Sequence, residues 1–120
     1  MKILLDRNLP DALRTHLAPH EGTLLRERGW SQLENGELLR EAEVEFDVLL
    51  TTDSNITSQQ NIPKHRIALI VLRAFSNKME NFLPMLPELL AKLEVIRPGE
   101  AEYIYEDERL RRRDERKGKR

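Results

Sequence analysis

The chain has 120 residues and a net charge of −1, with 20 Lys/Arg against 21 Asp/Glu, and this length fits one domain that buries a core without disulfides. It contains no cysteine, which excludes a disulfide framework and a thiolate zinc site and suits the cytoplasm, where we expect the protein. No apolar run approaches the ~20 residues that span a bilayer, and the N-terminus lacks the features of a signal peptide, so we expect no membrane association.

The first half of the chain predicts two strands, each followed by a helix. Residues 2–6 are an apolar run of strand length, and residues 8–17 carry leucine at every fourth position, which is the spacing of an amphipathic helix. Asn8 is the expected N-cap of that helix. A shorter strand is predicted at 21–26, and a helix at 37–45 follows an Asn-Gly turn.

The second half predicts three further strands. The apolar run at 47–52 ends on an aspartate, and the run at 67–72 is apolar throughout, as in strands buried on both faces. Helical spacing continues over 79–93, but two prolines interrupt it and predict two short helices or one kinked helix. Residues 101–105 alternate in polarity, which favours an edge strand.

Charge is distributed unevenly along the chain. Residues 109–120 hold eight basic and two acidic side chains, a net charge of +6, and residues 1–108 carry a net charge of −7. We therefore expect a domain at 1–105 and a basic C-terminal tail at 106–120. Within this tail, we expect residues 109–120 to be mobile, or helical only through contact with a neighbour. Two interpretations of this tail stay open, a solvated end and an arm that binds nucleic acid.

Strand and helix signals alternate from end to end, which predicts a three-layer α/β/α fold with a mainly parallel sheet of about five strands. We predict that strand 2–6 is central and lies beside strand 67–72. The carboxyl ends of parallel strands share one edge of the sheet, where open α/β sheets place their sites. Asp6 and Asp53 end two of these strands, so we expect them to face each other across one crevice.

Two neighbouring aspartates repel each other unless a cation neutralises them, and Mg²⁺ is bound through such carboxylates, with waters and substrate phosphates as further ligands. Asn8 and Asn55 each follow an aspartate by two residues, and Glu37 would add a third carboxylate. This donor set is typical of metal-assisted phosphodiester hydrolysis. Structural interpretations also stand: strand-end aspartates form turns, asparagines cap helices, and first-turn glutamates complement the helix dipole.

Several stretches together resemble a small PIN-like protein family whose members open with a strand followed by Asp-Glu-Asn-Leu-Pro. The opening is here Asp6-Arg7-Asn8-Leu9-Pro10, and the other matches within residues 1–105 are Asn35-Gly36-Glu37-Leu38, the stretch from Asp47 to Asn55, Gln59-Gln60-Asn61 and Val71-Leu72-Arg73. The resemblance implies a PIN-type α/β/α fold and an endoribonuclease that depends on Mg²⁺ or Mn²⁺. Such hydrolases are often the toxin of a bacterial toxin–antitoxin pair.

By position, the resemblance implies catalytic metal ligands and supporting residues. The implied ligands are Asp6, Glu37 and Asp53, the supports are Asn8 and Asn55, and the matches without a derived role are Gln60 and Arg73. RNA is the implied substrate, and a small antitoxin protein is an implied partner. A homodimer is also expected, because the stretch 79–93 has more apolar residues than one buried face needs. The chain departs from the family at Arg7, which replaces a glutamate and either pairs with Asp6 or Asp53 or holds a substrate phosphate.

Two other functions compete with the nuclease. The departure at Arg7 favours a catalytically silent PIN-like module that binds a partner protein or RNA. A phospho-receiver-like domain also places acids after its first and third strands, but it needs a second acid beside Asp6 and a lysine late in the sheet, and this chain has neither. Metal-stimulated RNA cleavage tests the first alternative, and phosphate incorporation from a small-molecule donor tests the second.

Overall fold

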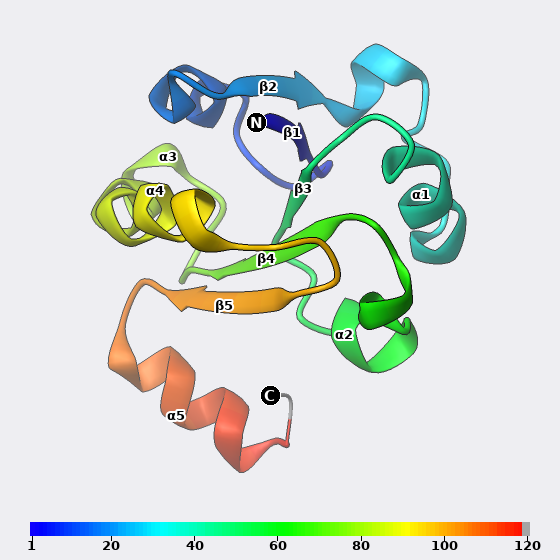
Figure 1. Cartoon of the computed structure of the whole chain (residues 1–120). Helices are drawn as coiled ribbons and strands as arrows, with labels where there is room; N and C mark the ends of the chain where they lie inside the picture. The colour runs from blue at the N-terminus through cyan, green and yellow to red at the C-terminus, as the bar shows by residue number, and fades with distance from the viewer. Residues whose placement is uncertain (119–120) are drawn as a thin grey trace.

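The computed structural model describes residues 1–118 and contains one five-stranded sheet, in which all strands are parallel (Figure 1). The strands are β1 (Lys2–Leu5), β2 (Glu21–Leu24), β3 (Val48–Thr51), β4 (Ala68–Arg73) and β5 (Ala101–Tyr105). Each predicted strand is present within two residues of its expected bounds, and β5 is an edge strand as expected. The predicted α/β class is therefore confirmed.

The lateral order of the strands, β2-β1-β3-β4-β5, corrects one expectation. β3 is central, and β1 pairs with β2 and β3 rather than with β4. The reason is the path of the chain, which places β2 on one side of β1 and then crosses back to place β3 on the other side. The direction of winding thus reverses between β1 and β3, and this reversal is the topological switch point at which open α/β sheets bind ligands.

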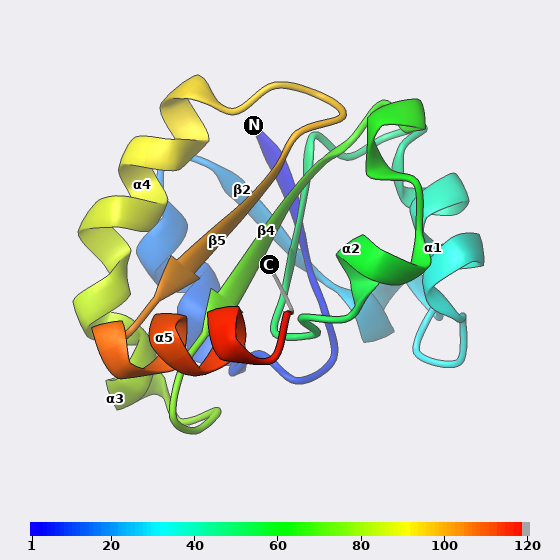
Figure 2. The same ribbon diagram turned by 90° about the horizontal axis from the view of Figure 1, so that it is seen from below.

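Helices cover both faces of the sheet and complete three layers (Figures 1 and 2). One face is covered by η1 (Asp11–Leu17), α3 (Met79–Phe82), η4 (Leu83–Met85) and α4 (Leu86–Val95). The other face is covered by η2 (Leu25–Arg28), α1 (Asn35–Ala42), α2 (Ile56–Gln59) and η3 (Ile62–Lys64). Among residues 1–118, no helix combines the length and the apolar character that crossing a membrane requires.

One predicted helix differs in detail from its expected form, and another agrees with it. The helix after β1 is a 3-10 helix, and its N-cap is Pro10 without a side-chain hydrogen bond, so Asn8 does not cap it. Asn8 instead lies in the turn that leaves β1, where the Leu9 amide donates to the Asp6 carbonyl oxygen. The stretch 79–93 is broken as predicted, because Pro84 and Pro87 each occupy the first turn of a new helical segment.

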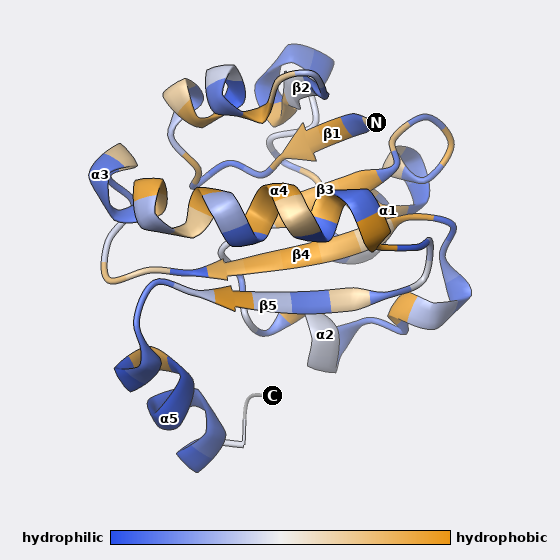
Figure 3. Ribbon diagram, turned by 60° about the vertical axis from the view of Figure 1, so that its left-hand side comes forward, coloured by the Kyte–Doolittle hydropathy of each residue, from blue (hydrophilic) through white to orange (hydrophobic). Residues whose placement is uncertain are grey.

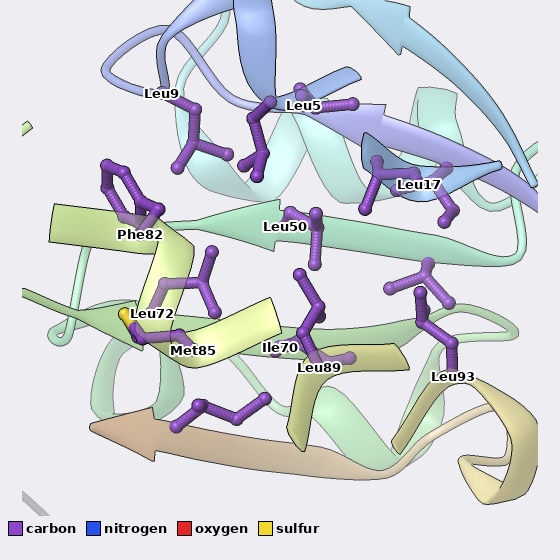
Figure 4. Packing of buried hydrophobic residues seen from close by; sticks show 14 of the residues in the cluster. Leu5, Leu9, Leu17, Leu50, Ile70, Leu72, Phe82, Met85, Leu89 and Leu93 are labelled. Carbon is purple, nitrogen blue, oxygen red and sulfur yellow. The ribbon is translucent and has the colours of Figure 1, made fainter. Parts of the chain in front are cut away.

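The apolar runs of β1, β3 and β4 are explained by burial on both sides of the sheet. Successive residues of a strand point to opposite faces, so Leu50 and Ile70 pack toward Leu89 of α4 (Figure 4), whereas Leu49 and Leu69 pack beneath α1 and α2. Figure 3 shows that β4 is hydrophobic along most of its length, whereas the C-terminal helix beyond β5 is hydrophilic. Full burial of each such side chain contributes roughly 1.5–3 kcal/mol.

The C-terminal segment forms a helix. Helix α5 (Glu108–Arg116) begins at Asp107, whose side chain accepts a hydrogen bond from the Arg109 amide, and it lies beside β5 (Figures 1 and 2). Leu110 is buried, and Asp114 is 1% exposed and bonded to Arg73 at the end of β4. Residues 109–116 thus form a helix that contacts the sheet, which agrees with the second of the two states expected for this segment. Positions 119–120 lie outside the described residues.

Candidate functional site

The ends of β1 and β3 bring Asp6 and Asp53 to one edge of the sheet. Leu5 pairs with Leu50 in the register of the two strands, and the Asp6 amide continues the ladder by donating to the Leu50 carbonyl oxygen at 2.9 Å. The next pair across the strands is therefore Asp6 and Thr51, and Asp53 follows two residues after Thr51. Both aspartates thus lie at one edge of the sheet, as the sequence predicted, and this edge is the topological switch point.

A short hydrogen-bond chain connects the two aspartates. The Asp53 amide donates to Thr51 Oγ1 at 3.0 Å, and the Thr51 hydroxyl donates to Asp6 Oδ2 at 2.7 Å. Thr51 is fully buried and Asp6 is 9% exposed, so this chain fixes the Asp6 carboxylate at the bottom of the site. The other oxygen of Asp6, Oδ1, accepts the Arg7 amide at 2.8 Å.

Neutral groups also orient the Asp53 carboxylate. Its Oδ1 accepts the Asn55 amide at 2.9 Å, and its Oδ2 accepts Nδ2 of Asn35 at 3.0 Å. Within residues 1–118, neither Asp6 nor Asp53 forms an ion pair with a lysine or arginine. Both carboxylates therefore lie at one edge of the sheet without an ion-pair partner among the described residues, although the Arg7 side chain lines the same depression.

The two aspartates open into a wide depression, which we call the acidic crevice, with a volume of about 620 Å³. Its lining is almost wholly polar and comprises Asp6, Arg7, Asn8, Ser31, Gln32, Leu33, Glu34, Asn35, Gly36, Thr52, Asp53, Gln59 and Gln60. Sites for small organic ligands are mostly apolar, so this lining favours a hydrated, charged ligand. A Cβ at Gly36 would lie 3.3 Å from Gln60 Oε1, so Gly36 and Gln60 lie close together at the rim.

The crevice includes some of the site residues that the sequence predicted and leaves out others. Asp6, Arg7, Asn8, Asp53 and Gln60 all line it. Asn55 contributes its amide to Asp53 and does not line the crevice in the described structure. Arg73 lies at the end of β4, where it pairs with Asp114.

The structure does not bring Glu37 to the crevice. Helix α1 begins at Asn35, two residues before the expected start, and Asn35 faces Asp53. Two residues correspond to about 200° of rotation around a helix, so Glu37 points away from the crevice and does not line it. Within residues 1–118, no group of three or more His, Asp or Glu side chains is arranged to hold a metal ion.

Arg7 takes neither of the ion pairs suggested for it. Its Nη2 donates to the Leu33 carbonyl oxygen at 3.0 Å, so the side chain extends across the crevice to the loop before α1. Thr51 and Asn35 both position the aspartates, although sequence reasoning assigned neither of them to the site. The register of β1 on β3 would have identified Thr51, because it places the threonine directly across from Asp6.

No family model, no curated protein and no solved structure matches the chain. The resemblance to PIN-like proteins therefore stays a prediction.

The oxygen atoms of the crevice are suitable ligands for a hard divalent cation. Each carboxylate oxygen of Asp6 and Asp53 accepts one hydrogen bond, and a carboxylate oxygen has a second lone pair that remains for a metal. Mg²⁺ is usually bound through one or two carboxylates and keeps several waters, so two aspartates are a sufficient protein contribution. Asn8, with its amide oxygen, lies on the same rim.

Proposed function

We propose that the chain is a metal-dependent endoribonuclease, which hydrolyses phosphodiester bonds at the acidic crevice. The observation that supports this most directly is the pair of aspartates joined through Thr51 at the switch point, because neither forms an ion pair with a lysine or arginine of residues 1–118. A bound Mg²⁺ or Mn²⁺ would supply charge neutralisation and would activate water.

The residues of the chain have separate roles in this proposal. Asp6 and Asp53 hold the cation, Thr51 and Asn35 keep their carboxylates oriented, and Asn8 contacts the hydrated ion. The width and polarity of the crevice favour a flexible, charged strand over a compact apolar ligand. The choice of RNA and the antitoxin come from the sequence resemblance. The homodimer is expected from the apolar residues of 79–93, and the cytoplasmic location from the absence of cysteine. All four stay predictions.

The test is the substitution Asp53→Asn. Its fold should persist, because an amide keeps an oxygen for the Asn55 amide and Asn35 can turn its own amide to accept. Removing one of two adjacent negative charges should leave the melting temperature unchanged or slightly raised. Cleavage should be abolished, because a neutral amide does not hold the cation. The measurements are a melting curve and RNA cleavage with Mg²⁺ or Mn²⁺.

The matched control is Glu37→Gln, which removes one acidic charge outside the crevice and should leave cleavage unchanged. Equal loss of cleavage in both variants would contradict the assignment of the site to Asp6 and Asp53. Wild-type protein that cleaves no RNA with either metal would favour the silent binding module instead. The observation that favours the module is Arg7, which puts a cation where the family has an acid and is bonded to Leu33.

The strand order gives the phospho-receiver one specific point of support. Receiver domains and flavodoxins share the order 2-1-3-4-5 and bind at the same switch point, and Asp53 follows the third strand here as the phosphorylated aspartate does there. The lining of the crevice argues against a phospho-receiver. Among residues 1–118 this lining includes no lysine, and Arg7 occupies the position beside Asp6 where a receiver has its second acid. Incubation with a radiolabelled small-molecule phosphoryl donor should give no label on Asp53, and labelling that Asp53→Asn removes would overturn the nuclease.

A further inference from the structure

A second pocket adjoins the acidic crevice, and we call it the basic pocket. It has a volume of about 260 Å³ and is lined by Arg40, Glu43, Gln60, Asn61, Lys64 and His65. Arg40 comes from α1 and Lys64 from η3, on the flank of the sheet that also carries α2 (Figure 2). Gln60 lines both the crevice and the basic pocket, so a ligand that extends over Gln60 would reach both.

The cations of the basic pocket are available for an external anion. Arg40 and Lys64 are exposed, and within the described residues 1–118 neither forms an ion pair. Arg66 lines an adjoining depression together with both of them. Phosphate is the anion that arginine and lysine side chains bind in nucleic acids.

The acidic residue of the basic pocket is occupied by internal contacts. Glu43 Oε2 lies 2.6 Å from Nδ1 of His65, and Oε1 accepts the Arg66 amide at 3.1 Å. The contact with His65 and the Arg66 amide lower the pKa of Glu43, so the carboxylate stays ionised. Because a carboxylate only accepts, Nδ1 carries a proton and Nε2 remains for another partner. The His65 side chain is only 7% exposed, and this contact holds its ring in place.

We propose that the basic pocket binds a backbone phosphate of the same RNA strand whose scissile phosphate lies in the acidic crevice. The inference rests on the proposed nuclease function for the identity of the strand. Arg40 and Lys64 supply the positive charge, Asn61 supplies a side-chain amide, and Gln60 contacts the nucleotide between the two phosphates. The crevice repels phosphate until a metal is bound, whereas the basic pocket attracts phosphate without metal. Binding and cleavage should therefore separate when metal is withheld.

The experiment measures binding of a labelled single-stranded RNA by fluorescence anisotropy in metal-free buffer over a series of salt concentrations. Arg40→Glu and Lys64→Glu should each weaken binding about tenfold, because each removes a charge-assisted hydrogen bond. The slope of log affinity against log salt should become shallower by about 0.7, the change expected when one phosphate fewer is neutralised on a single strand. Lys78→Glu, which changes an exposed lysine beside α3 on the opposite face by the same charge, should bind as wild type does.

Cleavage then distinguishes this inference from the function on which it rests. With metal present, Arg40→Glu should raise KM for a long RNA and leave kcat unchanged, and Arg40→Lys should restore most of the affinity. Equal losses for Lys78→Glu and Arg40→Glu, or a wild type that binds no RNA, would overturn the inference. If the wild type cleaves RNA but Arg40→Glu and Lys64→Glu bind RNA as the wild type does, the basic pocket is not a phosphate site, and the proposed nuclease function is unaffected. The expected binding losses without any cleavage would leave the basic pocket in place and remove the nuclease.

Discussion

Two buried aspartates near the carboxyl edge of the sheet carry their charges in different ways. Asp114 accepts two hydrogen bonds from the Arg73 guanidinium at the end of β4, at 2.7 and 3.0 Å, and this contact raises the pKa of Arg73. Asp6, at the end of β1, accepts from a hydroxyl and a backbone amide. The Asp114 carboxylate has its counterion within the chain and contributes to stability. The Asp6 carboxylate is held only by a neutral hydroxyl and a neutral amide, so its charge stays available to an external cation.

The largest effect on stability is expected where the charge is neutralised. Arg73→Ala removes the guanidinium that pairs with buried Asp114, and breaking a buried pair in this way costs roughly 3 kcal/mol. Urea denaturation should show this loss in the free energy of unfolding. Arg109→Ala is the control, because it breaks an exposed pair with Asp107 in the same helix and should cost under about 1 kcal/mol. Equal costs for the two variants would mean that α5 does not depend on Arg73.

Replacing both members of the buried pair sharpens the same comparison. When Arg73 and Asp114 become apolar together, neither is left as a buried charge without the other, so most of the stability lost in Arg73→Ala should return. Arg73→Leu combined with Asp114→Leu should therefore unfold at a higher urea concentration than Arg73→Ala alone. If the double variant is no more stable than Arg73→Ala, the stability of this region comes from other contacts of α5 rather than from the charge pair.

A smaller loss of stability is expected at the crevice, where neutral hydrogen-bond donors hold the Asp6 carboxylate. Thr51→Val keeps the shape of the side chain but removes the hydroxyl that bonds Asp6 and accepts the Asp53 amide. Leaving these groups unsatisfied should cost about 1–3 kcal/mol, measured by urea denaturation, and it should weaken metal binding in a calorimetric titration. Thr51→Ser is the control, because it restores the hydroxyl and should recover both properties. Normal metal affinity in Thr51→Val would contradict the positioning role.

The smallest effect is expected at the surface. Arg28 and then Lys2 lower the pKa of Glu45 from its ordinary value of 4.5 to about 2. Because the pKa of the folded state lies below that of the unfolded state, this carboxylate stabilises the fold above pH 4.5 and loses that contribution as the pH falls toward 2. Glu45→Gln should therefore show a flatter dependence of unfolding free energy on pH in that window. An unchanged acid slope would mean that solvent and salt screen the contact completely.

Much of the fold could be predicted because it depends on local sequence. Apolar runs of strand length at 2–6, 47–52 and 67–72 identified three strands, and two prolines located the break within 79–93. The lateral order could not be obtained in the same way. All three runs are buried on both faces, so their composition does not rank them, and only the path of the chain decides that β3 is central.

The same distinction applies to the candidate site. Asp6 and Asp53 could be found because each ends a strand, whereas the position of Glu37 depended on where α1 begins. Thr51 looked like an ordinary β-former until the register placed it opposite Asp6. Asp114 looked like part of a solvated tail, because its partner Arg73 lies 41 positions away in the chain.

The docking of α5 also has a consequence for synthesis of the protein. Every strand is made before this helix, so a growing chain can complete the sheet while the guanidinium of Arg73 still lacks its carboxylate. A product that terminates before position 114 would retain both aspartates of the crevice and would expose a charged group at the end of β4. Such truncated chains are expected to keep the arrangement of the crevice but to unfold more readily and to be degraded faster than the complete chain.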